Sequence, residues 1–201
     1  MKNTVFYFLI FLLSISTVNA QDLDDVFDDG LTTADNSIFF GANYFLEGAF
    51  TLGYERNVGG RKSYSVWAGV IFDEGIPTHA YLGDEMINYY SNQDNLNSGF
   101  LVGTNLKGYL YDNAGLFIGY EAGFEMRRGN TFGRNAYKLV FIVGYNWQFP
   151  KNNMGISISS GVGVQFFNRY RIVKLEYVYP TDSYAGFGAL IPFKLDLIKY
   201  F

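Results

Sequence analysis

The stretch GLFIGYEAGFEMRRG, from Gly115 to Gly129, alternates between two kinds of residue. Apolar side chains occupy the even positions from Leu116 to Met126, whereas the odd positions carry glycine, charge and Phe117. Successive side chains of a β-strand point to opposite faces. The alternation therefore predicts a strand with one apolar face and one face of small and charged residues, and each face must contact a different environment.

The same alternation recurs along the chain from Ser37 onward, between segments rich in turn-forming residues. We expect eight strands, at residues 37–45, 49–57, 63–73, 99–111, 115–129, 136–149, 155–168 and 184–201. Most of the connections between them alternate in length. The short ones are VGGRK (58–62), DNA (112–114) and PKNN (150–153), and the long ones are 74–98, 128–135 and 169–183. Short periplasmic turns and long external loops are typical of outer-membrane barrels, and an even number of strands places both termini in the periplasm.

The composition agrees with a β-rich chain that faces lipid. Of 201 residues, 49% are hydrophobic, 19% are aromatic and 23 are glycine, which suits one domain of ordinary size. The absence of cysteine excludes disulfides, thiolate zinc sites and a lipoprotein anchor. The net charge of −4 argues against a nucleic-acid partner.

The first 36 residues divide into two segments. Lys2, the nine apolar residues from Val5 to Leu13 and the small residues before Ala20 predict a secretory signal peptide at 1–20. A membrane-spanning helix would need about 20 apolar residues. Residues 21–36 read as a flexible acidic leader, because their carboxylates do not match the spacing of an EF-hand loop. Residues 37–201 then form the barrel.

The chemistry of the two faces decides between a membrane barrel and a soluble, lipocalin-type barrel. A soluble barrel would direct its apolar face inward, around a ligand, and a charged face outward. Here the second face is dominated by Gly, Ser and Asn, which is too small and too uncharged for a solvated exterior. Small residues suit the crowded interior of a narrow barrel, so we expect the aromatic face to contact lipid.

The chain resembles the small eight-stranded outer-membrane β-barrel family of Gram-negative bacteria over residues 37–201. The last strand of that family ends in Phe and has apolar residues at alternate positions before it, and here Phe193, Leu195, Leu197 and Phe201 match. Lys199 departs from this pattern, and Pro192 suggests a β-bulge. The resemblance implies location in the outer membrane and recognition by its insertion machinery. It implies little about activity, because the family includes structural proteins, adhesins and some enzymes.

Charged residues on the inward face form a predicted lumen network that, with Trp67 and Phe117, fills the barrel. Its members are Glu55, Lys107, Glu121, Glu125, Lys138, Lys194 and Asp196. Folding the hairpin at DNA places Lys107 opposite Glu121, so we expect an ion pair there and a second contact between Glu125 and Lys138. A narrow ion or solute pore through this lumen is the alternative function.

The loops suggest contact with the outer leaflet. Basic residues lie in or near the predicted loops 128–135 and 169–183, where they are candidates to contact phosphates of lipid or lipopolysaccharide: Arg127, Arg128, Arg134, Arg169, Arg171 and Lys174. Ordinary solvated loop charge is the alternative.

Few residues in the sequence suit catalysis or metal binding. His79 is the only histidine and no His-Ser pair accompanies it, although Asp73 and Glu74 lie nearby in sequence. We therefore expect neither catalysis nor a metal nor a cofactor, with a lipid-modifying enzyme that uses His79 as a further alternative. The sequence predicts a non-enzymatic outer-membrane barrel with a structural or surface-interaction role.

Overall fold

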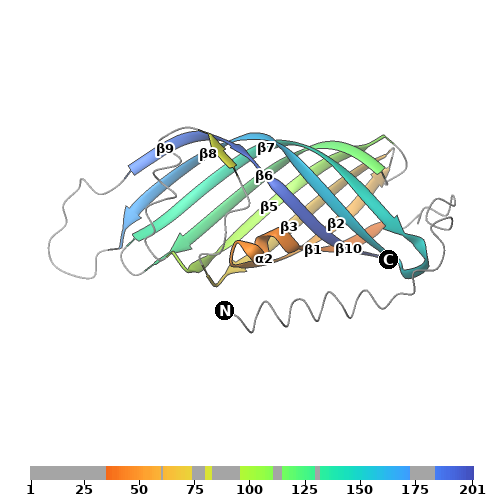
Figure 1. The fold of residues 1–201 in the computed structure, drawn as a ribbon, viewed down its shortest axis with the longest axis horizontal. Coiled ribbons are helices and arrows are strands. Elements are labelled where there is room, and N and C mark those ends of the chain that lie inside the picture. Colours follow the sequence, from red (N-terminus) through yellow and green to blue (C-terminus); the bar gives the residue numbers. More distant parts are fainter. Residues whose placement is uncertain are drawn as a thin grey trace. The chain divides into compact units, whose positions relative to one another are not determined.

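The computed structural model describes residues 35–59, 61–73, 80–82, 96–110, 115–129, 132–172 and 184–201. Among them are ten strands, one short α-helix and one 3₁₀ turn (Figure 1). In chain order these are β1 (Asn36–Gly41), α2 (Ala42–Leu46), β2 (Ala49–Gly59), β3 (Lys62–Ile71), β4 (Ala80–Leu82), β5 (Ser98–Tyr109), β6 (Gly115–Arg128), β7 (Phe132–Phe149), η2 (Pro150–Asn152), β8 (Met154–Arg171), β9 (Tyr184–Ile191) and β10 (Phe193–Tyr200). The predicted signal peptide and almost all of the predicted leader lie outside the described residues.

The strands close into an eight-stranded antiparallel barrel, which confirms the predicted fold class. Neighbours around the wall follow the order β1, β2, β3, β5, β6, β7, β8 and β10, and β10 pairs again with β1. We call the end where β2–β3, β5–β6 and β7–β8 connect the short-turn end, and the opposite end the loop end. In Figure 1 the loop end is at the left, where β8 and β9 reach furthest.

β9 and β10 act as one strand interrupted at Pro192. Both pair with β8, and Gly163 lies opposite Leu190 just as Ser160 lies opposite Phe193. The two pairs are three positions apart on both strands, so no residue is inserted and the expected bulge at Pro192 is wrong. β4 pairs with β9 up to Ile191, and β1 pairs with β10 from Asp196. Among the described residues, proline, which cannot donate to a ladder, therefore occupies a position with a paired strand on one side only.

The first strand is shorter than predicted, because the chain turns into α2 after Gly41. An extended chain would direct Asn43 and Tyr44 to opposite faces, and one of them would point away from the interior. In the helical turn both side chains are buried. The Oδ1 atom of Asn43 accepts a hydrogen bond from the backbone N–H of Leu195 at 3.3 Å. The side chain thus takes the place of a ladder partner at the position where β1 has ended.

Two strands, β7 and β8, reach further toward the loop end than expected. β6 continues to Arg128 and β7 begins at Phe132, so most of the predicted loop 128–135 is strand. β7 and β8 have 18 residues each, whereas a tilted span of a bilayer takes about 9–11. These two strands therefore extend well beyond the length of a single span.

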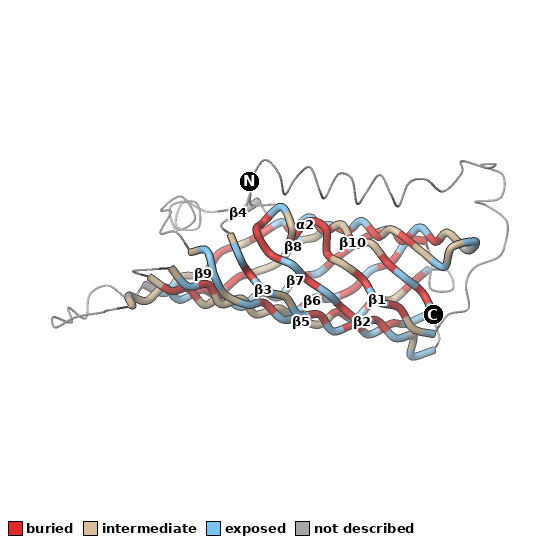
Figure 2. The backbone as a smooth tube through the Cα atoms, turned by 90° about the horizontal axis from the view of Figure 1, so that it is seen from below, coloured by how far each residue is buried: buried red, intermediate tan, exposed pale blue. Residues whose placement is uncertain are grey.

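Exposure follows the predicted alternation of the two faces. Tyr120 is 60% exposed, whereas its neighbour Glu121 is 1% exposed. Figure 2 shows the same alternation of buried and exposed residues along the strands of the wall. Most of the exposed large apolar side chains point outward, whereas the lumen holds the small and charged side chains together with a few large ones, such as Trp67 and Phe117.

Candidate functional site

The lumen is filled by large side chains that lie over glycines. In each of five inward-facing cross-strand pairs, a Cβ atom added to the glycine would come within 2.1–2.7 Å of the side chain opposite. The pairs are Phe39 with Gly53, Trp67 with Gly103, Lys138 with Gly123, Phe117 with Gly144, and Phe167 with Gly186. The glycines of the small face thus give the bulky residues room to cross the barrel.

At the short-turn end the lumen holds Glu55 as an acceptor of three hydrogen bonds. The Lys107 Nζ atom donates to Oε2 of Glu55 at 2.6 Å. Ser63 Oγ and Tyr109 Oη donate to the other carboxylate oxygen at 2.6 and 2.9 Å. This buried carboxylate is therefore both charge-paired and hydrogen-bonded, as a buried ion requires.

In the middle of the lumen Glu121 bridges two lysines. The Nζ atoms of Lys138 and Lys194 lie 2.9 and 2.5 Å from its two carboxylate oxygens. Lys138 also donates to the hydroxyl of Tyr44 at 2.8 Å, and both ammonium groups lie within 5.3–5.8 Å of the ring centroids of Tyr44 and Trp67. These cation–ring contacts and the shared carboxylate connect β3, β6, β7 and β10 with α2.

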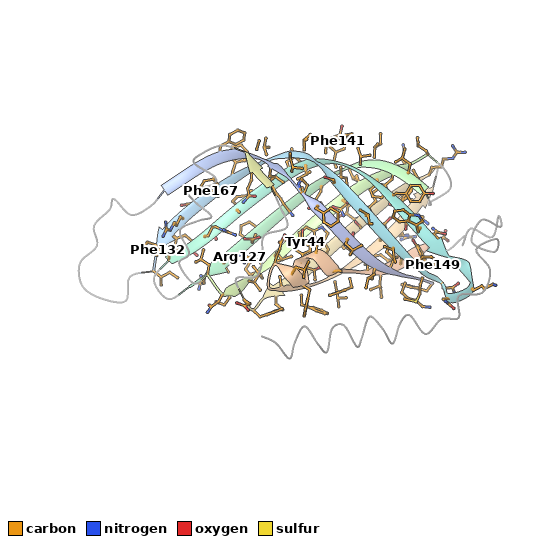
Figure 3. All side chains as sticks on the ribbon, in the orientation of Figure 1. Tyr44, Arg127, Phe132, Phe141, Phe149 and Phe167 are labelled. Carbon is orange, nitrogen blue, oxygen red and sulfur yellow. The ribbon has the colours of Figure 1, made fainter. Side chains whose placement is uncertain are left out.

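Near the loop end Glu125 binds two arginines. Arg127 Nε donates to Oε1 of Glu125 at 2.8 Å, and Arg134 Nη2 donates to the same oxygen. Both residues are 7% exposed, and their side chains face inward. Arg127 lies directly opposite Arg134 on β7, which in turn lies opposite Arg169 on β8. The three form one row across neighbouring strands, and Figure 3 labels Arg127, on β6, and Phe132, on β7, near this end.

The structure contradicts the expected ion pairs. Lys107 lies opposite Gly119 and Asn105 lies opposite Glu121, so the β5–β6 register is two residues away from the one expected. The hydrogen bond that the Leu110 N–H donates to the Leu116 carbonyl, next to the turn, belongs to the same register. The predicted turn residues 112–114 lie outside the described part of the chain.

The second expected pair, between Glu125 and Lys138, is also wrong. Glu125 lies opposite Ala136, and Lys138 lies opposite Gly123. The two charged residues therefore belong to separate clusters, Glu125 with the arginines and Lys138 with Glu121.

Asp196 also lies in the lumen, as expected, and is 6% exposed. Its Oδ1 atom has no hydrogen-bond partner among the described residues. Sequence reasoning missed Asn43, Tyr44 and Glu47, which are buried around α2, because this segment reads as strand. The non-alternating pair Asn43-Tyr44 was the available signal.

The basic residues expected at the lipid rim separate into two groups. Arg127 and Arg134 are buried inside the barrel and bonded to Glu125, so they do not form an outer rim. Arg128 is exposed on the outer face, and the guanidinium of Arg169 stacks 4.1 Å from the Phe132 ring centroid. The Arg171 side chain, Lys174, Glu74 and His79 lie outside the described part of the structure.

The last strand has the expected alternation. Phe193 and Phe201 are 45% and 58% exposed, and Leu195 and Leu197 are partly exposed. Lys199, which departs from the family pattern, donates from Nζ to the carbonyl of Asn152 at 2.7 Å, next to the β7–β8 turn.

The fold and the lumen together define the class of this protein: a closed eight-stranded antiparallel β-barrel whose interior is filled by aromatic and charged side chains. Within the described ranges no group of three or more candidate metal ligands comes together. No described helix is long and apolar enough to cross a membrane. Comparison with protein-family models, with curated proteins and with solved structures gives no match.

Proposed function

We propose that this barrel resides in the bacterial outer membrane and has a non-enzymatic role there, in membrane structure or surface interaction. The observation that carries the proposal is the outer face. Large apolar side chains that are 37–62% exposed occur on every barrel strand, including Leu52, Val66, Leu106, Ile118 and Val162. Soluble proteins rarely expose contiguous apolar surface larger than a few hundred Å². A hydrocarbon environment would cover this face.

Aromatic residues border the apolar face toward the loop end. Phe124, Tyr137, Phe166 and Phe187 lie directly opposite one another on four neighbouring strands. The ring centroids of the pairs Phe124–Tyr137 and Phe166–Phe187 are both 4.8 Å apart. Aromatic girdles of this kind mark the membrane interfaces of outer-membrane barrels. We call this set the aromatic row.

The other end has its own aromatic residues. Trp147 and Tyr145 are exposed on β7, with ring centroids 4.5 Å apart, and Tyr54 and Tyr64 are exposed on β2 and β3. Beyond the aromatic row, the outward residues on β7 and β8 become polar, at Asn135 and Asn168. These two borders support a membrane position with the apolar band between them.

The filled lumen favours a barrier over a pore. Trp67, Phe117 and the clusters around Glu55 and Glu121 occupy the interior that water would need. A narrow barrel of eight strands leaves little more room than its own side chains take up. We therefore expect lipid, including lipopolysaccharide, and the insertion machinery that reads the final strand to be the partners, and we expect no substrate to pass through.

Two measurements on the purified protein test this proposal. A closed membrane barrel should migrate differently on gels before and after boiling, and in planar bilayers it should give no stable conductance steps. Identical migration of boiled and unboiled samples would contradict the proposal of a closed membrane barrel. Reproducible single-channel steps would contradict a filled, non-conducting lumen and would favour the alternative function as a narrow pore.

Protease treatment of whole cells tests the orientation. The long connections 74–98 and 169–183 should be external and cleaved, and the short turn at 58–62 should be protected. Cleavage at 58–62 in intact cells would reverse the orientation. The outer-membrane fraction, separated on a density gradient, should contain the protein.

A further inference from the structure

The outer face of the wall changes character beyond the aromatic row. On β8 the outward residues after Phe166 are Asn168 and Tyr170, and the residues directly opposite them on β7 are Asn135 and Gly133. Asn168 is exposed, and Asn135 and Tyr170 are partly exposed. Apolar residues therefore give way to two amides and a tyrosine on the part of the wall where β8 reaches toward the loop end (Figure 1).

The Tyr170 side chain lies across the neighbouring strand. A Cβ atom added to Gly133 would come 2.4 Å from Cζ and 2.6 Å from Oη of Tyr170. Gly133 is buried although its position belongs to the outer face, because this ring covers it. The glycine thus lets the ring lie against the sheet, and the exposed part of the ring faces away from the wall. On the other side of Gly133, β6 contributes the exposed residue Arg128.

The position of this surface along the barrel indicates which layer of a membrane it meets. Tyr170 follows Phe166 by four residues on β8. At about 3.3 Å per residue and a strand tilt of about 40°, this step is about 10 Å along the barrel axis. If the aromatic row marks the interface, the surface lies beyond the acyl chains, at the level of the lipid headgroups. In the outer leaflet of an outer membrane these headgroups are the phosphorylated sugars of lipopolysaccharide.

We propose that Tyr170, Asn168 and Arg128 bind a sugar of the outer-leaflet glycolipid, an inference that rests on the membrane position proposed above. The C–H face of a sugar ring packs on an aromatic ring, whose faces carry partial negative charge. The Asn168 amide supplies both donors and an acceptor for neighbouring hydroxyls. The Arg128 guanidinium donates to hydroxyls or to a phosphate on the sugar. A flat ring beside an amide and one cation suits a sugar better than an acyl chain or a bare phosphate.

The shape of the surface favours a sugar that is carried by a lipid. The three side chains lie on an outward face of the sheet, whereas sites for free small molecules are mostly concave. A sugar whose lipid is confined to the surrounding leaflet has a high effective concentration next to the wall, so a few contacts suffice to hold it. The occupant is therefore the glycolipid and not a free saccharide.

The test uses the full chain, purified in a nonionic detergent and freed of bound lipid. Isothermal titration calorimetry in mixed micelles compares lipopolysaccharide that carries its core sugars with phosphatidylglycerol, an anionic lipid without a saccharide. We expect saturable binding of lipopolysaccharide, at least about tenfold tighter than that of phosphatidylglycerol. Equal binding of the two lipids would leave only attraction to anionic lipid and would overturn the site, as would binding of neither.

The ring is tested by two changes at one position. Tyr170→Ala should weaken the binding of lipopolysaccharide about fivefold or more and leave that of phosphatidylglycerol unchanged. Tyr170→Phe keeps the ring and should bind lipopolysaccharide within about twofold of the unchanged protein. The matched control is Tyr120→Ala, which removes an exposed tyrosine from the apolar band of β6. An equal loss in Tyr120→Ala and Tyr170→Ala, or a loss in Tyr170→Phe as large as that in Tyr170→Ala, would contradict packing of the sugar on this ring.

Gly133→Ala tests the geometry without removing any contacting group. Its Cβ would displace the Tyr170 ring from the strand, so the affinity for lipopolysaccharide should fall although all three binding residues are present. Unchanged affinity would show that the placement of the ring does not matter, and the site would fail. Migration of boiled and unboiled samples shows whether each variant is folded and keeps the two proposals apart. A protein whose migration changes on boiling but which does not prefer lipopolysaccharide loses only the sugar site.

Discussion

Replacing Glu121 with Gln should destabilise this barrel more than any other single change in the lumen network. Glu121 is 1% exposed and holds Lys194 at 2.5 Å and Lys138 at 2.9 Å. Glu121→Gln keeps the shape and leaves two ammonium groups buried without their shared anion. Breaking a buried pair by removing one partner costs about 3–5 kcal/mol.

The two lysine changes should cost less, and in a defined order. Lys194→Met leaves Glu121 paired with Lys138, and Lys138→Met leaves it paired with Lys194, so neither variant leaves the carboxylate alone. Each loses a hydrogen bond to a charged group, which is worth about 1.5–3 kcal/mol. The side chain of Lys138 is 14% exposed and that of Lys194 is 3% exposed, so Lys194→Met should cost the more of the two.

The assay is urea unfolding in micelles, followed by tryptophan fluorescence in a Trp147→Phe background. The remaining tryptophan, Trp67, has both ammonium groups within 5.4 Å of its ring centroid and reports on this cluster. A double-mutant cycle on Glu121→Gln and Lys194→Met should give a coupling of about 1–3 kcal/mol. The cycle on Glu121→Gln and Lys107→Met is the control, and it should be additive within about 0.5 kcal/mol because Lys107 is bonded to Glu55.

Two results would refute this reasoning. The first is a Glu121→Gln variant within about 1 kcal/mol of the unchanged protein, which would mean that the lysines are satisfied without the carboxylate. The second is a coupling between Glu121 and Lys107 larger than that between Glu121 and Lys194. It would restore the register expected from the sequence and contradict the one in the structure.

Further predictions concern packing and capping. Gly103→Ala should destabilise by about 1–3 kcal/mol in the same urea assay, because its new Cβ would lie 2.2 Å from the Trp67 ring. The control Gly108→Ala, on the same strand, has only one atom within 4 Å and should be tolerated far better. Asn43→Ala should cost about 1–3 kcal/mol and accelerate hydrogen exchange of the Leu195 amide, because that N–H loses its acceptor. Unchanged exchange would mean that another group caps the amide.

Face chemistry could be predicted from the sequence because it depends only on the period of two. The alternation around Tyr120 and Glu121 assigns each side chain to a face whatever the neighbouring strands do. The same rule fails at Asn43 and Tyr44, where tertiary packing favours a helical turn. The rule also does not locate the strand ends at the loop end, because inward arginines such as Arg127 and Arg134 resemble the charges of a solvated loop.

Register could not be predicted from the faces alone. A slip of one residue would turn Glu121 and Lys138 toward lipid, so the pattern excludes it strongly. A slip of two residues keeps every side chain on its face, and the turn at 112–114 was the only local guide. The misassigned pairing of Lys107 with Glu121 is a slip of this second kind.

The glycines of the lumen discriminate between such even-numbered slips. In the observed register Trp67 lies over Gly103, and a shift of two would place it over Leu101 or Asn105 instead. An inward ring that meets a side chain in place of a glycine either clashes or leaves the barrel too wide to close. The charges therefore select the face, and the pairing of large residues with glycines selects the register within that face.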